Sequence, residues 1–325
     1  MKKIQRITAF IICLFVVLSG SYVLGQRMMP ERNDFGATWG HYLAEPKNSV
    51  DVLFIGSSIA YCDIKPSIIY NEKGITSYMV CGPELTSSFS YYYLKEALKT
   101  QSPQAVMVEA TSFFFGEYTG YTKVNAGYMP FSANRIGAIF RASEKDQRLG
   151  LAFPLYNYHS RWNDEKVTYK GKREDCSIDL NAGYTFVDEI SPQEERSERN
   201  YYLSDEQLEK NLQWLKKIVK LCSDKDIELV FFIAPQCKYP SDELVSAVRD
   251  AAADVKLINY NDDFEKLGLD IGKDFHDSLH LNCYGADKFS PLVAGTLEAL
   301  GIVPSNTQAE LWEERVEYEM NRNDR

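Results

Sequence analysis

Five short apolar runs, separated by segments with helical periodicity, constrain the fold of this 325-residue chain more than any other feature. Runs of this length are typical of strands that are buried on both faces, as in a parallel sheet covered by helices. Their alternation with helical segments predicts an α/β domain with a five-stranded parallel sheet. The runs are Val52 to Ile55, Ile75 to Val80, Ala105 to Val108, Glu228 to Ala234, and Val255 to Ile258.

Helical periodicity marks the segments that connect and follow these runs. The expected helices cover Ser87 to Thr100, Leu203 to Cys222, Tyr284 to Leu300 and a charged tail from Thr307 to Met320, which we expect to pack on the surface. Ser204 with Gln207 resembles a capping box at the start of the second helix. Apolar stripes should face inward, with Leu208, Leu212, Leu215, Val219 and Cys222 in the second helix, and Phe289, Leu292, Val293, Leu297 and Leu300 in the third.

The first apolar run ends in Gly56-Ser57-Ser58, a tight turn that presents a hydroxyl. A serine hydroxyl is a poor nucleophile at neutral pH and needs an imidazole to take its proton, held in one tautomer by a further group. Asp277-Ser278-Leu279-His280 offers both, because a single turn can place the Asp277 carboxylate against one ring nitrogen of His280. The sequence therefore predicts Ser58 as nucleophile, His280 as base and Asp277 as the orienting acid.

Other assignments of these residues stay open at this point. Ser57 and Ser58 could simply cap a helix, with His280 an ordinary polar residue. Ser57 competes with Ser58 as the nucleophile, and His276 competes with His280 as the base.

The carboxyl ends of parallel strands share one edge of a sheet, where ligands gather. The second run ends at Cys81-Gly82, so the backbone amides of Ser58 and Gly82 are expected in the same crevice as the nucleophile. Gly82 could equally be an ordinary turn glycine.

At these residues the chain resembles the SGNH/GDSL hydrolase superfamily. The resemblance implies a flavodoxin-like three-layer α/β/α sandwich, a nucleophile in a Gly-x-Ser turn after the first strand and an Asp-x-x-His near the C-terminus. It assigns the nucleophile to Ser58, the base to His280 and its partner to Asp277. It also matches Gly82 to the glycine whose amide, together with the amide of Ser58, lines the oxyanion hole, and such donors typically matter by two to three orders of magnitude in rate.

The chain departs from this family after the third apolar run. Family members carry Gly-x-Asn-Asp there, and the asparagine donates to the oxyanion, whereas this chain has Val108-Glu109-Ala110-Thr111-Ser112-Phe113. Either the oxyanion hole has two amides only, or Thr111, Ser112 or a residue of the following insertion fills the gap. Glu109 could approach the site as a carboxylate or bond to neighbouring backbone.

An apolar run from Ile7 to Gly25 follows Lys2, Lys3 and Arg6 and is close to the roughly 20 residues that span a bilayer. A cleaved signal peptide would have a shorter apolar core before small residues. Ser19-Gly20-Ser21 could serve as such a site, but the run continues beyond it, so an uncleaved anchor is favoured. We expect an anchor or signal segment at 1–27 with a cytoplasmic N-terminus, and an extracytoplasmic SGNH-like domain at 28–325.

A long insertion at about 116–200 separates the third and fourth apolar runs. Its many aromatic residues argue against disorder; they include Tyr118, Tyr121, Tyr128, Phe131, Tyr156, Tyr158, Trp162, Tyr169 and Tyr184. Aromatic platforms with polar neighbours suit sugar rings, and an arginine suits a phosphate or carboxylate. We therefore expect Tyr158, His159, Arg161 and Trp162 to bind substrate; the alternative is that Arg161 forms a structural ion pair.

Charge and cysteine content narrow the possible partners. The net charge of -10 argues against a nucleic-acid partner, which would require a basic face. Seven cysteines include Cys13 in the apolar run, and none of the others stands in a metal-binding spacing. No metal and no cofactor are expected. The remaining six, Cys62, Cys81, Cys176, Cys222, Cys237 and Cys283, are buried thiols or include a disulfide.

The N-terminal anchor, the SGNH motifs and the absent asparagine together resemble the membrane-anchored branch with DltD-type and alginate O-acetylation-type proteins. The resemblance implies serine-dependent O-acyl transfer or ester hydrolysis, with acetyl as the expected group, on a cell-envelope polysaccharide or related glycan. It also implies a membrane-bound O-acyltransferase as partner. The alternative is a catalytically silent scaffold or glycan-binding subunit of an envelope acylation or export complex.

Overall fold

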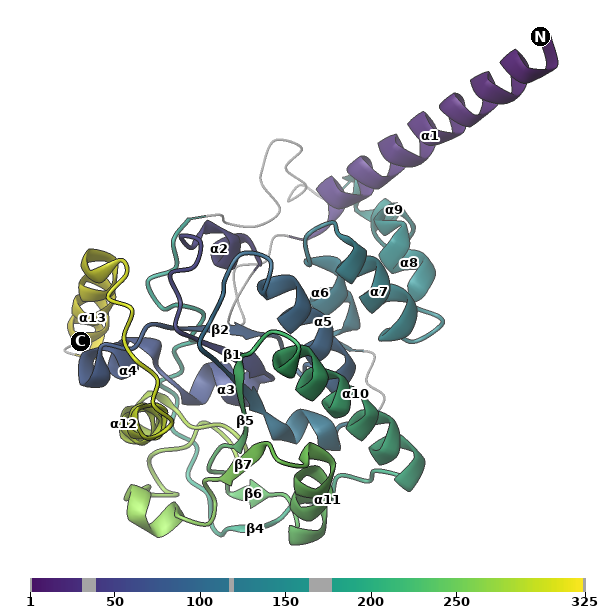
Figure 1. Cartoon of the computed structure of the whole chain (residues 1–325). Helices are drawn as coiled ribbons and strands as arrows, with labels where there is room; N and C mark the ends of the chain where they lie inside the picture. The colour runs from purple at the N-terminus through teal and green to yellow at the C-terminus, as the bar shows by residue number, and fades with distance from the viewer. Residues whose placement is uncertain (1, 31–38, 117–119, 164–176, 324–325) are drawn as a thin grey trace.

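The computed structural model describes residues 2–30, 39–116, 120–163 and 177–323, so the expected aromatic residues Tyr118 and Tyr169 and the expected thiol Cys176 lie outside the described residues. A five-stranded, wholly parallel sheet with order β2-β1-β3-β5-β7 forms the centre (Figure 1). The strands are β1 (Val52–Gly56), β2 (Ser77–Cys81), β3 (Ala105–Glu109), β5 (Glu228–Ile233) and β7 (Lys256–Asn259). The expected five-stranded α/β sandwich is confirmed, with strand ends shifted by one or two residues.

Helices cover both faces of this sheet because successive strand residues point to opposite sides. On one face, α3 (Ser58–Asp63), α4 (Pro66–Lys73) and α12 (Cys283–Ala299) pack against a core that includes Phe54 and Phe232. On the other, α5 (Ser87–Ala97), α10 (Asp205–Ser223) and α11 (Asp242–Ala252) pack against a core that includes Leu53 and Phe231. The result is a three-layer α/β/α sandwich.

The two amphipathic helices behave largely as their apolar stripes indicate. In α10, Leu215 and Cys222 are buried, and Leu208, Leu212 and Val219 pack against the same core. Ser204 accepts a hydrogen bond from the Gln207 amide at 3.2 Å, so the expected cap is present. In α12, Phe289, Val293 and Leu297 are buried, but Leu292 is 38 % exposed, so its expected inward orientation is wrong. A helix that packs on one side buries a single stripe of side chains, and in this turn of α12 Val293 lies in that stripe.

The C-terminal helix α13 (Ala309–Asn323) is held more firmly than a surface helix requires. Trp312 and Arg315 are buried, and Arg315 forms an ion pair with Glu45. The fully buried Lys65 of the loop before α4 reaches Glu319 and also Asp287 of α12, each at 2.7 Å. Buried ion pairs therefore join this helix to the domain. The sequence led us to expect packing on the surface only, and the helix is held more firmly than that.

The insertion contains short helices. These are α6 (Thr122–Gly127), α7 (Ala133–Arg141), α8 (Arg148–Ala152), α9 (Pro154–Tyr158) and the 3-10 turn η2 (His159–Asn163); the segment also supplies strand β4 (Ser197–Glu198), which pairs with β6 (Lys238–Tyr239). Two further helical elements near β1 and β3 are α2 (Trp39–Ala44) and η1 (Ala110–Phe114), and η3 (Phe264–Leu267) precedes the histidine loop. Among the described cysteines, no pair forms a disulfide, and all except Cys13 are buried.

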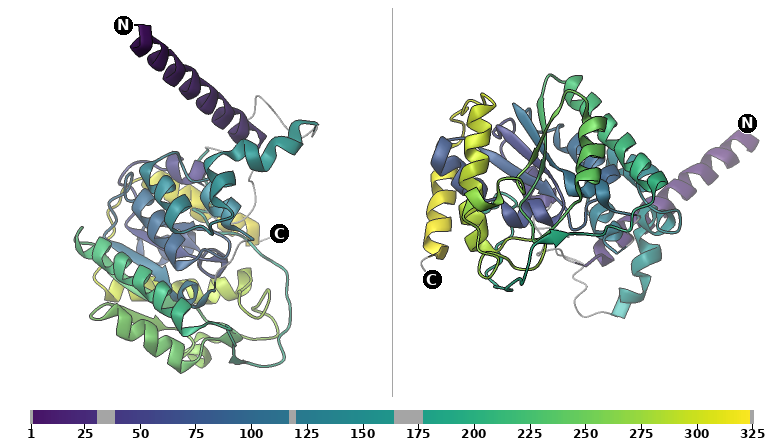
Figure 2. Two further views of the ribbon diagram at one scale, coloured as in Figure 1. Left: turned by 90° about the vertical axis from the view of Figure 1, so that its right-hand side faces the viewer. Right: turned by 90° about the horizontal axis from the view of Figure 1, so that it is seen from below.

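At the N-terminus of the chain, a single long helix, α1 (Lys2–Met28), extends away from the folded domain (Figures 1 and 2). Within the described residues it is the one helix long and apolar enough to cross a membrane. Its last turns pack against α9, where Gly25 allows close approach: a Cβ there would lie 2.2 Å from the Leu155 nitrogen. The apolar segment therefore belongs to a helix that is joined to the folded domain.

Candidate active site

The turn that carries Ser57 and Ser58 lies between β1 and α3. Ser57 is the N-cap of α3, and its Oγ accepts a weak hydrogen bond from the Ile59 amide at 3.4 Å. Ser58 is the first residue of the helix and lies at the mouth of a cavity. Gly56 leaves room behind the turn, because a Cβ there would lie 2.5 Å from the Cβ of Glu109. The helix-cap interpretation thus fits Ser57 and leaves Ser58 for chemistry.

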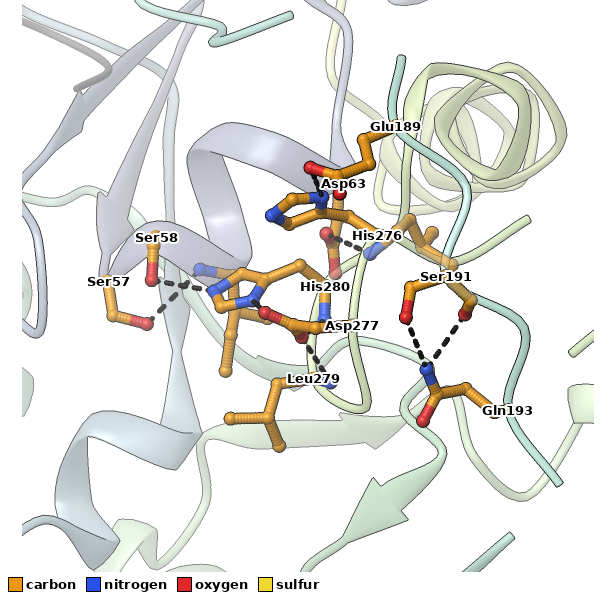
Figure 3. A network of polar contacts seen from close by, with 12 residues as sticks. Ser57, Ser58, Asp63, Glu189, Ser191, Gln193, His276, Asp277, Leu279 and His280 are labelled. Atoms are coloured by element: carbon orange, nitrogen blue, oxygen red, sulfur yellow. Dashed lines mark hydrogen bonds and ion pairs between the residues drawn. The ribbon is translucent and has the colours of Figure 1, made fainter. Parts of the chain in front are cut away.

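Ser58, His280 and Asp277 form one continuous hydrogen-bonded chain (Figure 3). Nδ1 of His280 lies 2.8 Å from Oδ2 of Asp277, and Nε2 lies 2.8 Å from Oγ of Ser58. An ionised carboxylate only accepts, so Nδ1 carries the proton and donates. Nε2 of the neutral ring then accepts from the Ser58 hydroxyl, which is the arrangement that a general base needs.

The carboxyl of Asp277 is kept ionised by its surroundings. Burial raises its pKa, but hydrogen bonds and charge from His280, together with the amides of Leu279 and His280, outweigh burial and lower the pKa to about 2. Both amides donate to Oδ1, at 2.7 and 2.9 Å. The same loop that carries the imidazole therefore also orients the acid, as the short spacing between them predicts.

A second carboxyl, which the sequence did not single out, joins this loop to the nucleophile helix. Asp63, at the last position of α3, is fully buried and accepts from the Leu281 amide at 2.8 Å. Burial raises its pKa well above the usual value. Because α3 begins with Ser58 and ends with Asp63, this bond fixes the distance between the serine and the residue that follows His280.

Glu109, at the end of β3, lies behind the nucleophile turn. It accepts from the Ser57 hydroxyl at 3.2 Å, from the Thr111 amide at 2.8 Å and from the Thr111 hydroxyl. Burial raises its pKa to about 7, although these hydrogen bonds and the nearby His280 lower it. Glu109 therefore does part of what each sequence-based alternative described. Its carboxyl accepts from the neighbouring backbone at Thr111, and it also contacts Ser57, next to the proposed nucleophile.

The expected oxyanion donors are only partly in place. The Gly82 amide donates to the carbonyl of Gly56 at 3.2 Å, which continues the pairing of β2 with β1, so this donor is already engaged. Thr111 and Ser112 are fully buried and bond to Glu109. Neither of these two candidates for the role of the missing asparagine is among the described walls of the cavity at Ser58.

Ser58 and His280 line a cavity of about 220 Å³. Its other described walls are Ile59, Glu84, Phe114, Phe115, Gly116, Arg199, Tyr201 and Leu279. Four of these side chains are apolar, which suits a short acyl group. The cavity thus offers an apolar space directly beside the serine hydroxyl.

Arg199 and Tyr201 bring polar groups to this cavity from the end of the insertion. The Arg199 guanidinium lies 4.7 Å from the Tyr201 ring centroid, and its own backbone amide donates to the Tyr239 carbonyl at 2.8 Å. Nη1 of Arg199 is buried and makes no hydrogen bond within the described part of the chain. Sequence reasoning left room for an unspecified insertion residue here but had no signal that selected Arg199.

The four residues expected to bind substrate lie elsewhere. Tyr158 ends α9, His159, Arg161 and Trp162 belong to η2, and none of them is among the described walls of the cavity. Arg161 instead donates to the Met28 carbonyl at 2.8 Å, at the end of α1. This segment thus contacts the end of α1 through Arg161, and substrate binding by the four residues stays a prediction.

His276 is also removed from the serine. Its Nδ1 lies 3.7 Å from Oε2 of Glu189, and its backbone amide donates to the His280 carbonyl at 3.0 Å (Figure 3). It therefore supports the loop of His280, while the contact with Ser58 belongs to His280 alone among the described histidines.

An α/β sandwich with a hydrogen-bonded Ser-His-Asp chain at the carboxyl edge of its sheet has the arrangement of a serine hydrolase. No protein-family model matches this sequence, and no curated protein matches it. Among solved structures, the chain is similar to a "putative acylhydrolase" from Bacteroides fragilis, with 11 % identity, a TM-score of 0.39, and coverage of 81 % of this chain and 99 % of that one. It is also similar to a GDSL-like lipase from Bacteroides thetaiotaomicron, with 11 % identity, a TM-score of 0.35, and coverage of 77 % and 88 %.

Proposed function

We propose that this chain is a serine-dependent esterase or O-acyltransferase that acts on short acyl esters, acetyl above all, of a cell-envelope glycan. The observation that carries the proposal is the chain of contacts from Asp277 through His280 to the Ser58 hydroxyl, with both His280 contacts at 2.8 Å. The small apolar cavity beside Ser58 supports a short acyl group. The glycan is proposed from the resemblance of the motifs to envelope-acylating proteins.

In the first half of the reaction, Ser58 Oγ attacks the acyl carbonyl while its proton passes to Nε2 of His280. The tetrahedral intermediate collapses, the ester C–O bond breaks, and the imidazolium returns the proton to the departing alkoxide. The Asp277 carboxylate stabilises that imidazolium through the Nδ1–H bond. An acyl-serine remains.

In the second half, a water or a sugar hydroxyl enters the place of the leaving group. The oxygen of this water or hydroxyl attacks the acyl carbon while His280 takes the proton from it. Ser58 Oγ then leaves the acyl carbon and recovers the proton from His280. Water as acceptor gives hydrolysis, and a glycan hydroxyl gives transfer. The chemistry at the protein is the same in both cases, so the acceptor that reaches the cavity decides between them.

The developing oxyanion needs hydrogen-bond donors. We assign one to the backbone amide of Ser58 and a second to Arg199, because its buried Nη1 is without a partner in the described part of the chain and its side chain lines the cavity. Arg199 then takes the role of the asparagine that the sequence lacks. A guanidinium has only N–H donors and no acceptor, so it suits an oxyanion.

We further propose that α1 spans the cytoplasmic membrane with its basic N-terminus inside and the sandwich outside. Its length and apolar composition support the span, and Lys2, Lys3 and Arg6 at one end support the orientation. A membrane-bound O-acyltransferase as partner is proposed from the family resemblance.

The test uses the full-length protein in detergent with a fluorophosphonate probe and with p-nitrophenyl acetate. We expect wild-type labelling and turnover, abolished labelling in Ser58→Ala, and turnover reduced by roughly 10³-fold or more in Ser58→Ala and His280→Ala. His276→Ala is the matched control, because its ring faces Glu189, and should keep most activity.

Two results would overturn the assignment. Loss of activity in His276→Ala with retention in His280→Ala would show that His276, and not His280, is the base. A wild type that reacts neither with the probe nor with small esters, and transfers no acetyl to added glycan fragments, would favour the silent scaffold or glycan-binding subunit.

A further inference from the structure

The insertion exposes an unusual concentration of large apolar side chains. Seven residues from Phe131 to Trp162 are between 39 and 74 % exposed, and we call them the collar: Phe131, Ile136, Phe140, Leu149, Phe153, Tyr156 and Trp162. Single exposed apolar side chains are ordinary, but several from one continuous segment mark a surface that meets another apolar phase. Phe131 lies just before α7 and Phe153 just before α9, and the others belong to α7, α8, α9 and η2.

The short helices that carry the collar lie beside the end of α1 that joins the domain (Figures 1 and 2). The ring of Phe131 lies 5.4 Å from that of Tyr22, and Arg135 of α7 donates to the Tyr22 hydroxyl at 2.9 Å. Gly25 packs directly on the backbone of α9. These contacts tie the short helices to the last turns of α1 and fix their level along its axis.

The position of these contacts along the axis of α1 can be compared with the position of a bilayer surface. The apolar run of α1 from Ile7 to Gly25 is about 28 Å long at 1.5 Å per residue, close to the roughly 30 Å thickness of the hydrocarbon core. If the run fills the core, Tyr22 and Gly25 lie at its outer boundary. Side chains packed at their level then lie at the membrane interface, where Trp and Tyr are favoured.

We infer that the collar is a membrane-docking surface that enters the outer interface of the same bilayer that α1 spans. The lipid bilayer is the occupant because the collar continues the lipid-facing surface of α1, whose apolar window is fully exposed in the protein. The inference depends on the proposed membrane span. It adds that the folded domain rests against the lipid on one defined side and does not hang freely from its anchor.

Tryptophan fluorescence offers a direct test because α1 contains no tryptophan. The chain has four tryptophans, of which Trp39 and Trp312 are buried and Trp214 packs on the core, while Trp162 belongs to the collar. Full-length protein is reconstituted into phosphatidylcholine vesicles brominated close to the headgroup end of the acyl chains. We expect bromine to quench part of the emission in the wild type and in Trp214→Phe, and that quenched part to disappear in Trp162→Phe.

A second set of variants keeps the test independent of Trp162 itself. Phe153→Asp combined with Tyr156→Asp places charges on the collar, and we expect at least a twofold loss of Trp162 quenching. Tyr202→Asp is the matched control, since Tyr202 is 90 % exposed outside the collar, and should leave quenching unchanged. All these side chains are exposed, so the variants should fold, which near-ultraviolet circular dichroism checks.

The possible failures can be told apart. Protein that does not float with the vesicles contradicts the membrane span itself. Protein that floats but whose quenching is equal in wild type and Trp162→Phe contradicts the collar. Two copies per nanodisc together with unquenched Trp162 would show that a second chain covers the collar, and would also overturn the inference.

Discussion

The hydroxyl of Ser57 donates a hydrogen bond of 3.2 Å to the carboxyl of Glu109, and both residues are fully buried. Ser57 immediately precedes the proposed nucleophile, while Glu109 ends the neighbouring strand β3. The bond therefore ties the turn between β1 and α3 to the adjacent strand. The position of Ser58 depends on this tie as well as on its contact with His280.

Replacement of Ser57 by alanine separates structure from chemistry at this turn. Ser57→Ala removes an N-cap and a bond to a buried carboxyl, which should cost about 1–3 kcal/mol in the free energy of unfolding. Ser58 remains, so fluorophosphonate labelling should persist, with turnover lowered by roughly tenfold as the turn loosens. Urea unfolding and peptide mapping of the label measure both effects. Labelling that disappears in Ser57→Ala but survives in Ser58→Ala would make Ser57 the nucleophile.

The buried carboxyl of Glu109 should make stability depend on pH with a defined sign. Its pKa rises from 4.5 to about 7 on folding, so between these values the unfolded chain releases a proton that the folded chain keeps. The contribution of Glu109 to stability therefore falls as pH rises through this window and levels off above it. A shift of this size corresponds to about 3 kcal/mol.

Glu109→Gln provides the comparison, because glutamine has a similar shape and no proton to release. We expect the wild type, relative to this variant, to lose up to about 3 kcal/mol in the free energy of unfolding between pH 4.5 and pH 7. Burial above all, and also the charge of Glu109, raise the pKa of Asp63, so the contribution of Asp63 does not cancel completely in the difference. Urea unfolding of the two proteins across this range measures it, and a difference that does not change with pH would refute the role of Glu109.

The strands and the contact between Asp277 and His280 were predictable from sequence because both depend on local patterns. A strand buried on both faces reads as a continuous apolar run, and four of the five predicted runs begin within one residue of the observed strand. Asp277 and His280 are three residues apart, so one turn sets their contact. Their meeting with Ser58, 222 residues from His280, followed from strand topology, since the nucleophile turn lies at the edge where the carboxyl ends of the strands meet.

The residues that sequence missed take their roles from distant packing. Nothing local distinguishes Arg199 from other arginines; it reaches the cavity because β4 pairs with β6, which brings the end of the insertion to Ser58. The role of the segment from Tyr158 to Trp162 could not be decided from sequence, because aromatic and basic residues suit a sugar platform and a membrane interface equally well. Only its contact with the end of α1 separates these two interpretations.

Arg199 should affect catalysis more than substrate binding. If Nη1 stabilises the developing oxyanion, Arg199→Ala should lower kcat for p-nitrophenyl acetate by roughly 10²-fold with a small change in KM. Arg199→Lys should recover part of this loss, because lysine keeps the charge but not the planar donors. Arg249→Ala, on the exposed face of α11, is the control. A change confined to KM would instead make Arg199 a substrate-binding residue.

The junction between α1 and α9 gives a prediction about the N-terminal helix. Leucine at Gly25 would clash with the backbone of Leu155, since even a Cβ would approach it to 2.2 Å. Gly25→Leu should therefore detach the last turns of α1 and expose the bond after Arg27 to trypsin, with cleavage at least tenfold faster than in the wild type.

Gly20→Leu is a matched control in the same helix, because a Cβ at Gly20 meets nothing within 4 Å. Intact-mass measurement of the digested full-length protein in detergent follows the reaction. Equal cleavage rates in the wild type and both variants would show that α1 is not held against the domain, and the collar would then lose its fixed level in the membrane.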